Sequence, residues 1–413
     1  MAAGDLDVSF GTAGKAVVDF GETSIVNAMA VQSDQSLVLA GRVGNPGTGD
    51  WALARLLPNG SLDTTFGTGG KVTLNFSALA DIVRAVAIQP DDGKIVAAGL
   101  ANSEPAGDIA VARFHPNGSL DTTFGTGGKV TYDISGPTGD AIRAMVLQPD
   151  GKILGAGVAG ANPAIIRLNT DGSLDTTFAG GAGKAAVPIG TAGHIFALAL
   201  LSTGKFLVAG FGTPTLANDF MLARFNPDGS LDATFGTGGS VLTDFNLLND
   251  LAFAVAVQPD GRILVGGDTD AADPFGVGGD IKAGWVRYNA DGSLDTTFDG
   301  DGKRQVNPTL TSDGIRGLAI QNDGKTLACG FIGEANSVTS FLDPVVGDFG
   351  VYRLNTNGTP DTSFGTGGFV RTDFGRQGDG CRAIALQTTN KIVVAGGATT
   401  NRLNFAAARY KAT

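Results

Sequence analysis

Two charged residue types recur at a fixed spacing along this sequence, and together they could bind a polar ligand. Aspartate occupies one equivalent position in five copies of a repeat, and arginine follows three residues later in four copies. The aspartates are Asp81, Asp140, Asp250, Asp313 and Asp379, and the arginines are Arg84, Arg143, Arg316 and Arg382. Carboxylate oxygens from several elements suit a hard cation such as Ca²⁺, with Asp250 and Asp313 as the candidate metal ligands. The competing interpretation is structural, in which each aspartate caps a turn and pairs with its local arginine.

Two long segments of the sequence add further carboxylates. They span Asp268–Ala283 and Phe331–Asp348, and they lengthen the repeats that contain them. Their acidic residues are Asp268, Asp270, Asp273, Asp280, Asp343 and Asp348. Ligand contacts are usually made where otherwise similar repeats differ. We therefore expect Asp270 and Asp343 to contribute to binding a glycan or a protein.

Catalytic residue types are scarce. Of the two histidines, His194 lies beside the ligand-binding position of its repeat, where it could act as a general base. His115 replaces a turn asparagine, so we expect its side chain to be exposed. The sequence has no Asp-x-Asp-x-Asp-Gly loop, nucleophile elbow or phosphate-binding glycine loop. An ordinary loop residue is therefore the simpler interpretation of His194.

A short motif defines the repeat that must position these side chains. Leu-Asp-x-Thr/Ser-Phe, with small variations, has its aspartate at residues 7, 63, 121, 175, 232, 295 and 361, roughly 54 to 66 residues apart. Four short apolar segments lie between successive motifs, and their Val, Ile, Ala and Phe content is typical of strands. In the second repeat these segments are Lys71–Phe76, Arg84–Gln89, Lys94–Leu100 and Asp108–Phe114.

Seven copies of four antiparallel strands predict an all-β protein, a closed seven-bladed β-propeller. Radial closure protects the sheet edges that an open array would leave unpaired. Glycine turns such as Gln148-Pro149-Asp150-Gly151 join the second and third segments as hairpins. The N-terminal strand Lys15–Phe20 is expected to complete the last blade. Residues 1–413 then form one domain, with repeats starting near Leu6, Leu62, Leu120, Leu174, Leu231, Leu294 and Pro360.

The repeat resembles the bacterial delta-60 repeat, from Leu6 to Tyr410. Three strings carry the resemblance: Leu-Asp-Thr-Thr-Phe-Gly-x-Gly-Gly-Lys-Val, Ala-Val-x-x-Gln-Pro-Asp-Gly-Lys-Ile and Ala-Arg-Phe-x-Pro-Asp-Gly. That family is similar to NHL and gluconolactonase-like propellers. The resemblance implies that Arg84–Gln89 is innermost, that Lys71–Phe76 is outermost, and that the protein is secreted or at the cell surface. It leaves the activity open.

A second arginine and the motif aspartate recur in every repeat, and we predict that they are structural. The arginines of the fourth segment are Arg55, Arg113, Arg167, Arg224, Arg287, Arg353 and Arg409. A single active site would need such a residue once. Seven equivalent copies instead predict partly buried ion pairs or hydrogen bonds inside each blade.

Composition excludes several classes of partner. A net charge of −11 argues against nucleic acid, whose phosphates need clustered Lys and Arg. No apolar run of the length of a membrane-spanning helix is present. The first residues do not form a signal peptide, so either the protein is cytoplasmic or a signal peptide was removed. Cys329 and Cys381 are expected to be two buried thiols, with a single bridge as the alternative.

Two functions remain open on the sequence alone. The first is a non-enzymatic binding propeller, secreted or surface-associated and monomeric, that presents the variable loops of one face to a glycan or a protein. The second is a metal-assisted hydrolase or lyase resembling lactonase-like propellers, with carboxylates holding Ca²⁺ and His194 as base. A purely structural module of a larger surface protein is a third possibility.

Overall fold

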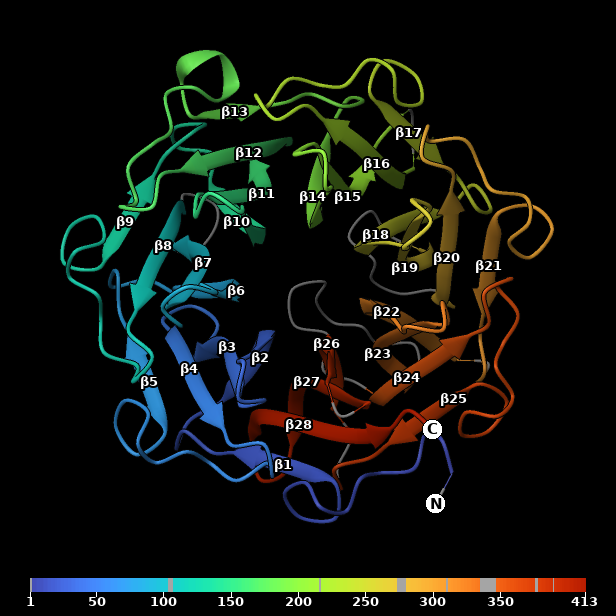
Figure 1. The fold of residues 1–413 in the computed structure, drawn as a ribbon, viewed down its shortest axis with the longest axis horizontal. Coiled ribbons are helices and arrows are strands. Elements are labelled where there is room, and N and C mark those ends of the chain that lie inside the picture. The colour runs from blue at the N-terminus through green and yellow to red at the C-terminus, as the bar shows by residue number, and fades with distance from the viewer. Residues whose placement is uncertain are drawn as a thin grey trace.

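Seven sheets of four antiparallel strands are arranged radially around one axis (Figure 1). The computed structural model describes residues 2–102, 107–214, 217–272, 280–309, 311–334, 347–375, 378–388 and 390–413. Each sheet is one blade, and in six of the seven blades the strands follow one another in sequence from the axis outward. The all-β, seven-bladed propeller predicted from the repeat is confirmed.

The first six blades are each continuous in sequence, from the innermost strand to the outermost. Blade 1 comprises β2 (Ser24–Val31), β3 (Leu37–Val43), β4 (Asp50–Leu56) and β5 (Lys71–Leu74), and blade 2 comprises β6 (Ile82–Ile88), β7 (Ile95–Ala101), β8 (Asp108–Phe114) and β9 (Lys129–Tyr132). Blade 3 comprises β10 (Asp140–Leu147), β11 (Ile153–Ala159), β12 (Asn162–Leu168) and, after the short 3₁₀ helix η1 (Ala179–Gly181), β13 (Lys184–Ala186). Blade 4 comprises β14 (Gly193–Leu200), β15 (Phe206–Gly212), β16 (Asp219–Phe225) and β17 (Ser240–Thr243). Blade 5 comprises β18 (Asn249–Val257), β19 (Ile263–Ala271), β20 (Lys282–Tyr288) and β21 (Lys303–Val306), and blade 6 comprises β22 (Ser312–Ile320), β23 (Thr326–Glu334), β24 (Asp348–Leu354) and β25 (Phe369–Thr372).

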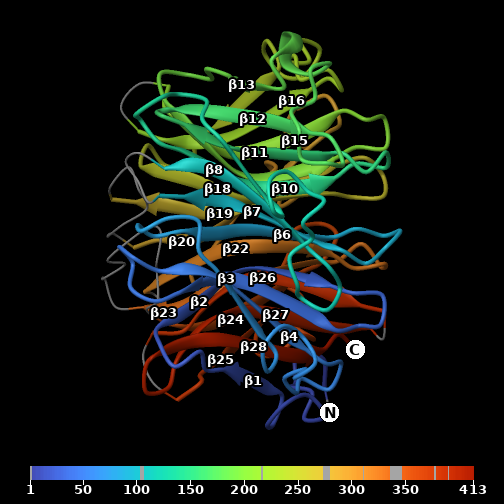
Figure 2. The same cartoon turned by 90° about the vertical axis from the view of Figure 1, so that its left-hand side faces the viewer.

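Blade 7 closes the ring with both ends of the chain. Its strands are β26 (Gly380–Gln387), β27 (Lys391–Thr399), β28 (Leu403–Lys411) and the N-terminal β1 (Lys15–Val18). Strand β1 pairs with β28 in the register Lys15↔Ala408 to Val18↔Phe405. The two termini consequently lie close together in both views (Figures 1 and 2). The expectation that the N-terminal strand completes the last blade is confirmed.

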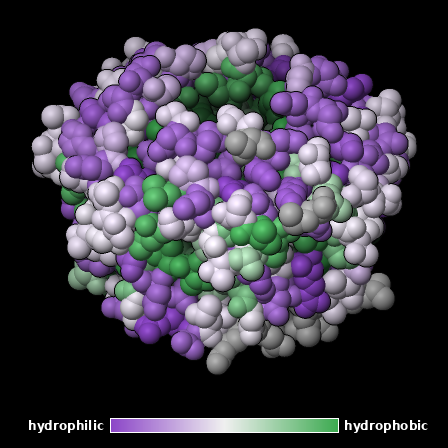
Figure 3. Space-filling model, turned by 60° about the horizontal axis from the view of Figure 1, so that its bottom comes forward, coloured by the Kyte–Doolittle hydropathy of each residue, from purple (hydrophilic) through white to green (hydrophobic). Residues whose placement is uncertain are grey.

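The hydrophobic core lies between neighbouring blades. All seven residues of β7 are buried, whereas the outermost strand β9 of the same blade has none that is fully buried. One cluster joins Trp51 and Leu53 of blade 1 to Val83 and Ile95 of blade 2. Burial of apolar surface between sheets therefore drives the packing of the blades. The face of the molecule shown in Figure 3 is largely hydrophilic, with hydrophobic patches between.

The hairpins between the first and second strands of each blade keep their turn geometry where the sequence varies. Gly151 has φ of 79°, and its N–H donates to the carbonyl of Gln148 over 2.9 Å. In blade 4 the turn sequence differs, yet Gly204 has the same φ of 79°. Asn390 has φ of 56° in blade 7, in the left-handed region that asparagine tolerates.

Seven Arg–Asp ion pairs, five of them with a buried arginine, link each blade to the next. The arginine Nε lies 2.6 to 2.9 Å from the motif carboxylate in Arg55–Asp63, Arg113–Asp121, Arg167–Asp175, Arg224–Asp232, Arg287–Asp295, Arg353–Asp361 and Arg409–Asp7. The same guanidinium donates to a backbone carbonyl of the following blade, as Arg167 does to Pro227 over 2.5 Å. Arg409 donates to Pro58 and so links blade 7 to blade 1. The predicted structural role of this pair is confirmed.

The environment of the motif aspartates favours their charged form. Burial raises the pKa of Asp7, but hydrogen bonds from Ser9 and the charge of Arg409 outweigh it and lower that pKa to about 2. The arginine also lies over the motif phenylalanine, 4.8 Å from the ring centroid for Arg409 and Phe10. In each motif, a charged Arg–Asp pair and an arginine stacked on a phenylalanine therefore help to hold neighbouring blades together.

Three smaller expectations from the sequence also hold. Cys329 on β23 and Cys381 on β26 are buried, free thiols in one apolar cluster. Among the described residues, no helix has the length and apolar character needed to cross a membrane. The side chain of His115 is 44% exposed.

Candidate functional site

Every innermost strand contains a β-bulge that places one residue outside the ladder of strand pairs. The register breaks between Val83 and Ala85 in β6, and it breaks at the equivalent position in the other six blades. The bulged residues are Asn27, Arg84, Arg143, Phe196, Phe253, Arg316 and Arg382. A bulge redirects the side chain of its extra residue. These seven side chains line one cavity of about 100 Å³, to which each blade contributes one residue. We call this cavity the axial pocket.

The axial pocket has a basic part and an aromatic part. Phe196 and Phe253 lie side by side in blades 4 and 5, with ring centroids 4.9 Å apart. An arginine flanks them on each side: Arg143 lies 5.3 Å from the Phe196 centroid, and Arg316 lies 3.9 Å from the Phe253 centroid. Cations stack favourably on aromatic faces, which holds these guanidinium groups at the wall of the pocket.

The remaining part of the wall is polar. Arg382 of blade 7 donates to Oδ1 of Asn27 in blade 1 over 2.7 Å. The amide of Asn27 donates in turn to the carbonyl of Val83 over 2.8 Å. Arg84 of blade 2 follows next around the ring. Asn27 is thus oriented by its neighbours on both sides.

A buried carboxylate balances part of the positive charge. Asp268 of β19 accepts a hydrogen bond of 2.6 Å from Nη1 of Arg316, and one of 3.2 Å from the backbone N–H of Ile315. Its second oxygen, Oδ2, is buried and has no hydrogen-bond partner among the described residues. Burial raises the pKa of Asp268, and the charge of Arg316 opposes this effect. Because the side chains that line the pocket include four arginines, the lining is suited to an anion.

The five aspartates predicted to bind a ligand lie outside the axial pocket. They are buried at the start of the innermost strands or directly before them, where their carboxylates accept backbone N–H groups. Asp81 accepts from Phe76 over 2.6 Å and from Asn102 over 3.0 Å, so it ties two loops together. Asp379 does the same with Phe374 and Thr399, both over 2.8 Å. Turn capping, the first part of the structural interpretation, accounts for these contacts. The second part, pairing with the local arginine, does not describe Arg316, which pairs with Asp268 of the neighbouring blade.

Burial shifts the protonation of three of these carboxylates. It raises the pKa of Asp250 to about 7, and Asp270 and Asp244 add like-charge repulsion. It raises the pKa of Asp379 to about 6 and also raises the pKa of Asp313. Asp270 is itself paired with Lys282 over 2.6 Å. Asp343 lies outside the described residues.

His194 lies on strand β14, paired with Phe211, so the expectation of an ordinary loop residue is wrong. It is near the axial pocket but does not line it. Its ring centroid is 5.0 Å from that of Phe211 and 6.1 Å from that of Phe196. Burial, and to a lesser extent the charge of Arg143, lower its pKa to about 3. Its Nδ1 atom makes no hydrogen bond with any described residue. The imidazole is therefore neutral at physiological pH and a weak base.

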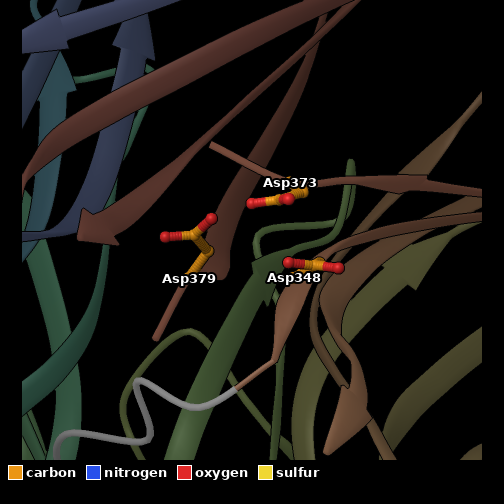
Figure 4. A group of neighbouring side chains, drawn as sticks. All are labelled: Asp348, Asp373 and Asp379. Atoms are coloured by element: carbon orange, nitrogen blue, oxygen red, sulfur yellow. The ribbon is translucent and has the colours of Figure 1, made fainter. Parts of the chain in front are cut away.

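Three carboxylates meet near the junction of blades 6 and 7. Ligand atoms of Asp348, Asp373 and Asp379 all lie within 4.8 Å of one another, and the side chains point toward each other (Figure 4). Arg371 forms an ion pair with Asp348, and Asp379 already accepts two backbone N–H groups. These contacts satisfy much of the hydrogen-bonding capacity that a cation would need, and we assign no ion to this cluster.

The sequence predicted four of the seven residues that line the axial pocket. Asn27, Phe196 and Phe253 were missed, although each follows the aligned position by three residues, as the arginines do. The signal was therefore present in the spacing. It was overlooked because these side chains are neutral and their type differs between repeats.

Comparison with known proteins agrees with this architecture. Residues 32–66, 91–124, 148–178, 201–235, 258–298 and 345–364 match a family described as "Domain of unknown function (DUF5122) beta-propeller". Every matched segment ends at the phenylalanine of a repeat motif. A search of curated proteins found no similar sequence.

Solved structures share the fold at low sequence identity. A catalytically inactive variant of virginiamycin B lyase from Staphylococcus aureus, solved with quinupristin, is 11% identical, with a TM-score of 0.56 over 95% of this chain and 98% of the lyase. Sqt1 from Chaetomium thermophilum, bound to the N-terminus of ribosomal protein L10, is 13% identical, with a TM-score of 0.51 over 96% and 98%. YCF48 bound to a D1 peptide is 12% identical, with a TM-score of 0.50 over 99% and 97%. The matched repeats and the seven four-stranded blades together support the assignment of this chain to a β-propeller family.

Proposed function

We propose that the protein is a non-enzymatic binding propeller that accepts an acidic group of a partner protein in the axial pocket. The observation that carries this proposal is that four blades each direct one arginine at the same cavity. A guanidinium stays charged at physiological pH and offers parallel N–H donors that match the oxygens of a carboxylate or phosphate. The flanking rings of Phe196 and Phe253 keep two of these arginines in place.

A protein partner fits the size of the pocket better than a glycan. The cavity of about 100 Å³ is well below the roughly 300 to 1,000 Å³ of sites that enclose a whole small molecule. It admits one group of a larger ligand. Sqt1 and YCF48, which share the fold, were solved with protein or peptide ligands. The proposal also includes membership of the delta-60 repeat family, which the sequence resembles, and the secreted or surface location that this resemblance implies.

A metal-assisted hydrolase or lyase is the second candidate, and the geometry favours it less. Such an enzyme needs a base near a bound cation. His194 has a pKa of about 3, too low for an efficient base at neutral pH. Ca²⁺ at the Asp348, Asp373 and Asp379 cluster would have to displace Arg371. The similarity to a lyase concerns the fold, which does not determine the activity.

Calorimetric titration with inorganic sulfate and phosphate at low ionic strength tests the proposed function. We expect the native protein to bind one anion, and the double variant Arg84→Gln/Arg382→Gln to bind it about tenfold or more weakly. Arg402→Gln removes an exposed arginine outside the pocket and serves as the matched control. Equal binding by all three proteins would refute the proposal.

A further inference from the structure

We infer that the axial pocket receives the C-terminal residue of the partner, with its carboxylate on the arginines and its apolar side chain on the phenylalanines. This inference rests on the proposed function and names its ligand chemistry. It would be mistaken, with the proposed function intact, if the acidic group of the partner were an internal acidic side chain.

The pocket wall offers cations and apolar surface at the same level of the channel. All seven lining residues occupy the same bulge position, so the basic and aromatic groups surround one point on the axis. Arg143 and Arg316 lie directly beside Phe196 and Phe253, within 5.3 Å of their ring centroids. A ligand at this level meets both kinds of group at once. A simple anion would use the arginines and make no use of the rings.

The chemistry of a chain terminus supplies both complementary groups together. A C-terminal residue carries a carboxylate and a side chain on the same Cα atom, so the two groups lie within a few ångströms of each other. The carboxylate can accept paired N–H donors from arginine, and an apolar side chain can lose water against the rings. An internal glutamate separates its carboxylate from the nearest apolar side chain by a further residue.

The size of the pocket also favours a chain terminus. The cavity, of about 100 Å³, is small and is lined by one residue from each of the seven blades. An internal residue whose backbone entered the pocket would bring two chain segments with it. A chain terminus needs only one segment to pass.

The aromatic wall is rigid enough to select an apolar side chain. Phe196 and Phe253 pack against a buried cluster that contains Phe211, Leu251 and Phe331. The guanidinium of Arg316 contacts both Phe253 and Phe331, 5.0 Å from the centroid of the latter, and Asp268 accepts its hydrogen bond. A wall formed before binding loses little conformational entropy when the ligand arrives.

Binding of matched fluorescent peptides to the full chain tests the inference. The first peptide, Gly-Gly-Ser-Gly-Phe, has a free C-terminal carboxylate, and the second has the same sequence with a C-terminal amide. The third ends in glycine with a free carboxylate, and the fourth is an amidated Gly-Glu-Gly-Ser-Gly. We expect the first to bind best and the amide to bind about tenfold or more weakly, because it lacks the charge-assisted hydrogen bonds. Phe253→Ala should remove the preference of the first peptide over the third.

The outcomes separate this inference from the proposed function. Sulfate binding together with equal affinity for the acid and amide peptides would overturn the inference and leave an anion-binding propeller. Binding of the amidated glutamate peptide as tight as that of the first peptide would overturn the C-terminal assignment in the same way. Failure of sulfate and of every peptide to bind would overturn both proposals. Circular dichroism and melting curves of Phe253→Ala establish that the variant is folded, and Phe196→Ala provides a second test of the aromatic wall.

Discussion

Arg316 and Asp268 form an ion pair across two blades at the wall of the axial pocket, with Nη1 and Oδ1 2.6 Å apart. Arg316 is the bulged residue of β22 in blade 6, and Asp268 belongs to β19 in blade 5. The pair both positions one pocket arginine and reduces the positive charge that a ligand meets. A change at Asp268 should therefore affect stability and binding together.

Asp268→Asn should weaken the fold and strengthen anion binding. The variant removes the carboxylate that pairs with Arg316, and loss of a charge-assisted hydrogen bond costs about 1.5 to 3 kcal/mol in the free energy of unfolding. It also adds one net positive charge to the pocket, so the dissociation constant for sulfate should fall. Chemical unfolding and calorimetry measure the two quantities. Asp260→Asn, in an exposed turn, is the control, and a weaker affinity for sulfate in Asp268→Asn would contradict the charge argument.

Arg55→Met should destabilise the junction between blades 1 and 2. The substitution leaves the buried carboxylate of Asp63 without this ion-pair partner, and it removes the hydrogen bond from Arg55 to the carbonyl of Pro116. Breaking one side of a buried pair costs on the order of 3 kcal/mol. Urea unfolding gives the change in free energy. Arg402→Met, which replaces an exposed arginine outside the motif, should cost less; equal losses would show that the motif pair adds little to stability.

The stability of the fold should fall as the pH rises from about 4 to about 7, in part because of Asp250. Its pKa in the folded protein is about 7, raised from 3.8 by burial, so the folded state holds a proton that the unfolded state has released. Raising the pH through this window therefore favours unfolding. Asp250→Asn should reduce the drop in melting temperature between about pH 5 and pH 8, measured by calorimetry. An unchanged drop would mean that this carboxylate is already ionised in the folded protein.

His194 should contribute a pH dependence of the opposite sign. Its pKa is lowered from 6.5 to about 3, so the unfolded state gains a proton below pH 6.5 while the folded state stays neutral. Stability from this group is present above about pH 6.5 and is lost as the pH falls. His194→Phe should therefore lose less stability than the native protein on acidification. NMR of the imidazole provides a direct check, and a chemical-shift change centred near pH 6.5 would refute the assignment.

The fold could be predicted from the sequence because seven repeats carry the same pattern of strands and turns. Each copy of the motif supplied the same strands, turns and Arg–Asp pair, so an ambiguity in one repeat was resolved by the others. The four pocket arginines were found by the same alignment. The conformations of Gly151 and Asn390 also follow from residue type, because few residues adopt a positive φ.

The orientation of the charged side chains could not be predicted in the same way. Asp81 and Arg84 are three residues apart, yet the aspartate is buried among backbone N–H groups and the arginine lines the pocket. The β-bulge at Arg84 turns this side chain toward the pocket, and no residue type in the sequence predicts the bulge. The partnership of Arg316 with Asp268 depends on how two blades pack together. A net charge of −11 likewise gave no indication of a basic cavity on the axis.

The central claim is that the four arginines of the axial pocket bind an anion. The most direct test is anomalous diffraction from crystals soaked in selenate. Selenate has the charge and shape of sulfate, and its selenium atom is located independently of the protein phases. We predict one selenium peak in the axial pocket, within hydrogen-bonding reach of Arg84 and Arg382, that disappears in Arg84→Gln/Arg382→Gln crystals. A pocket without selenate in native crystals, with selenate bound at other arginines instead, would contradict the account.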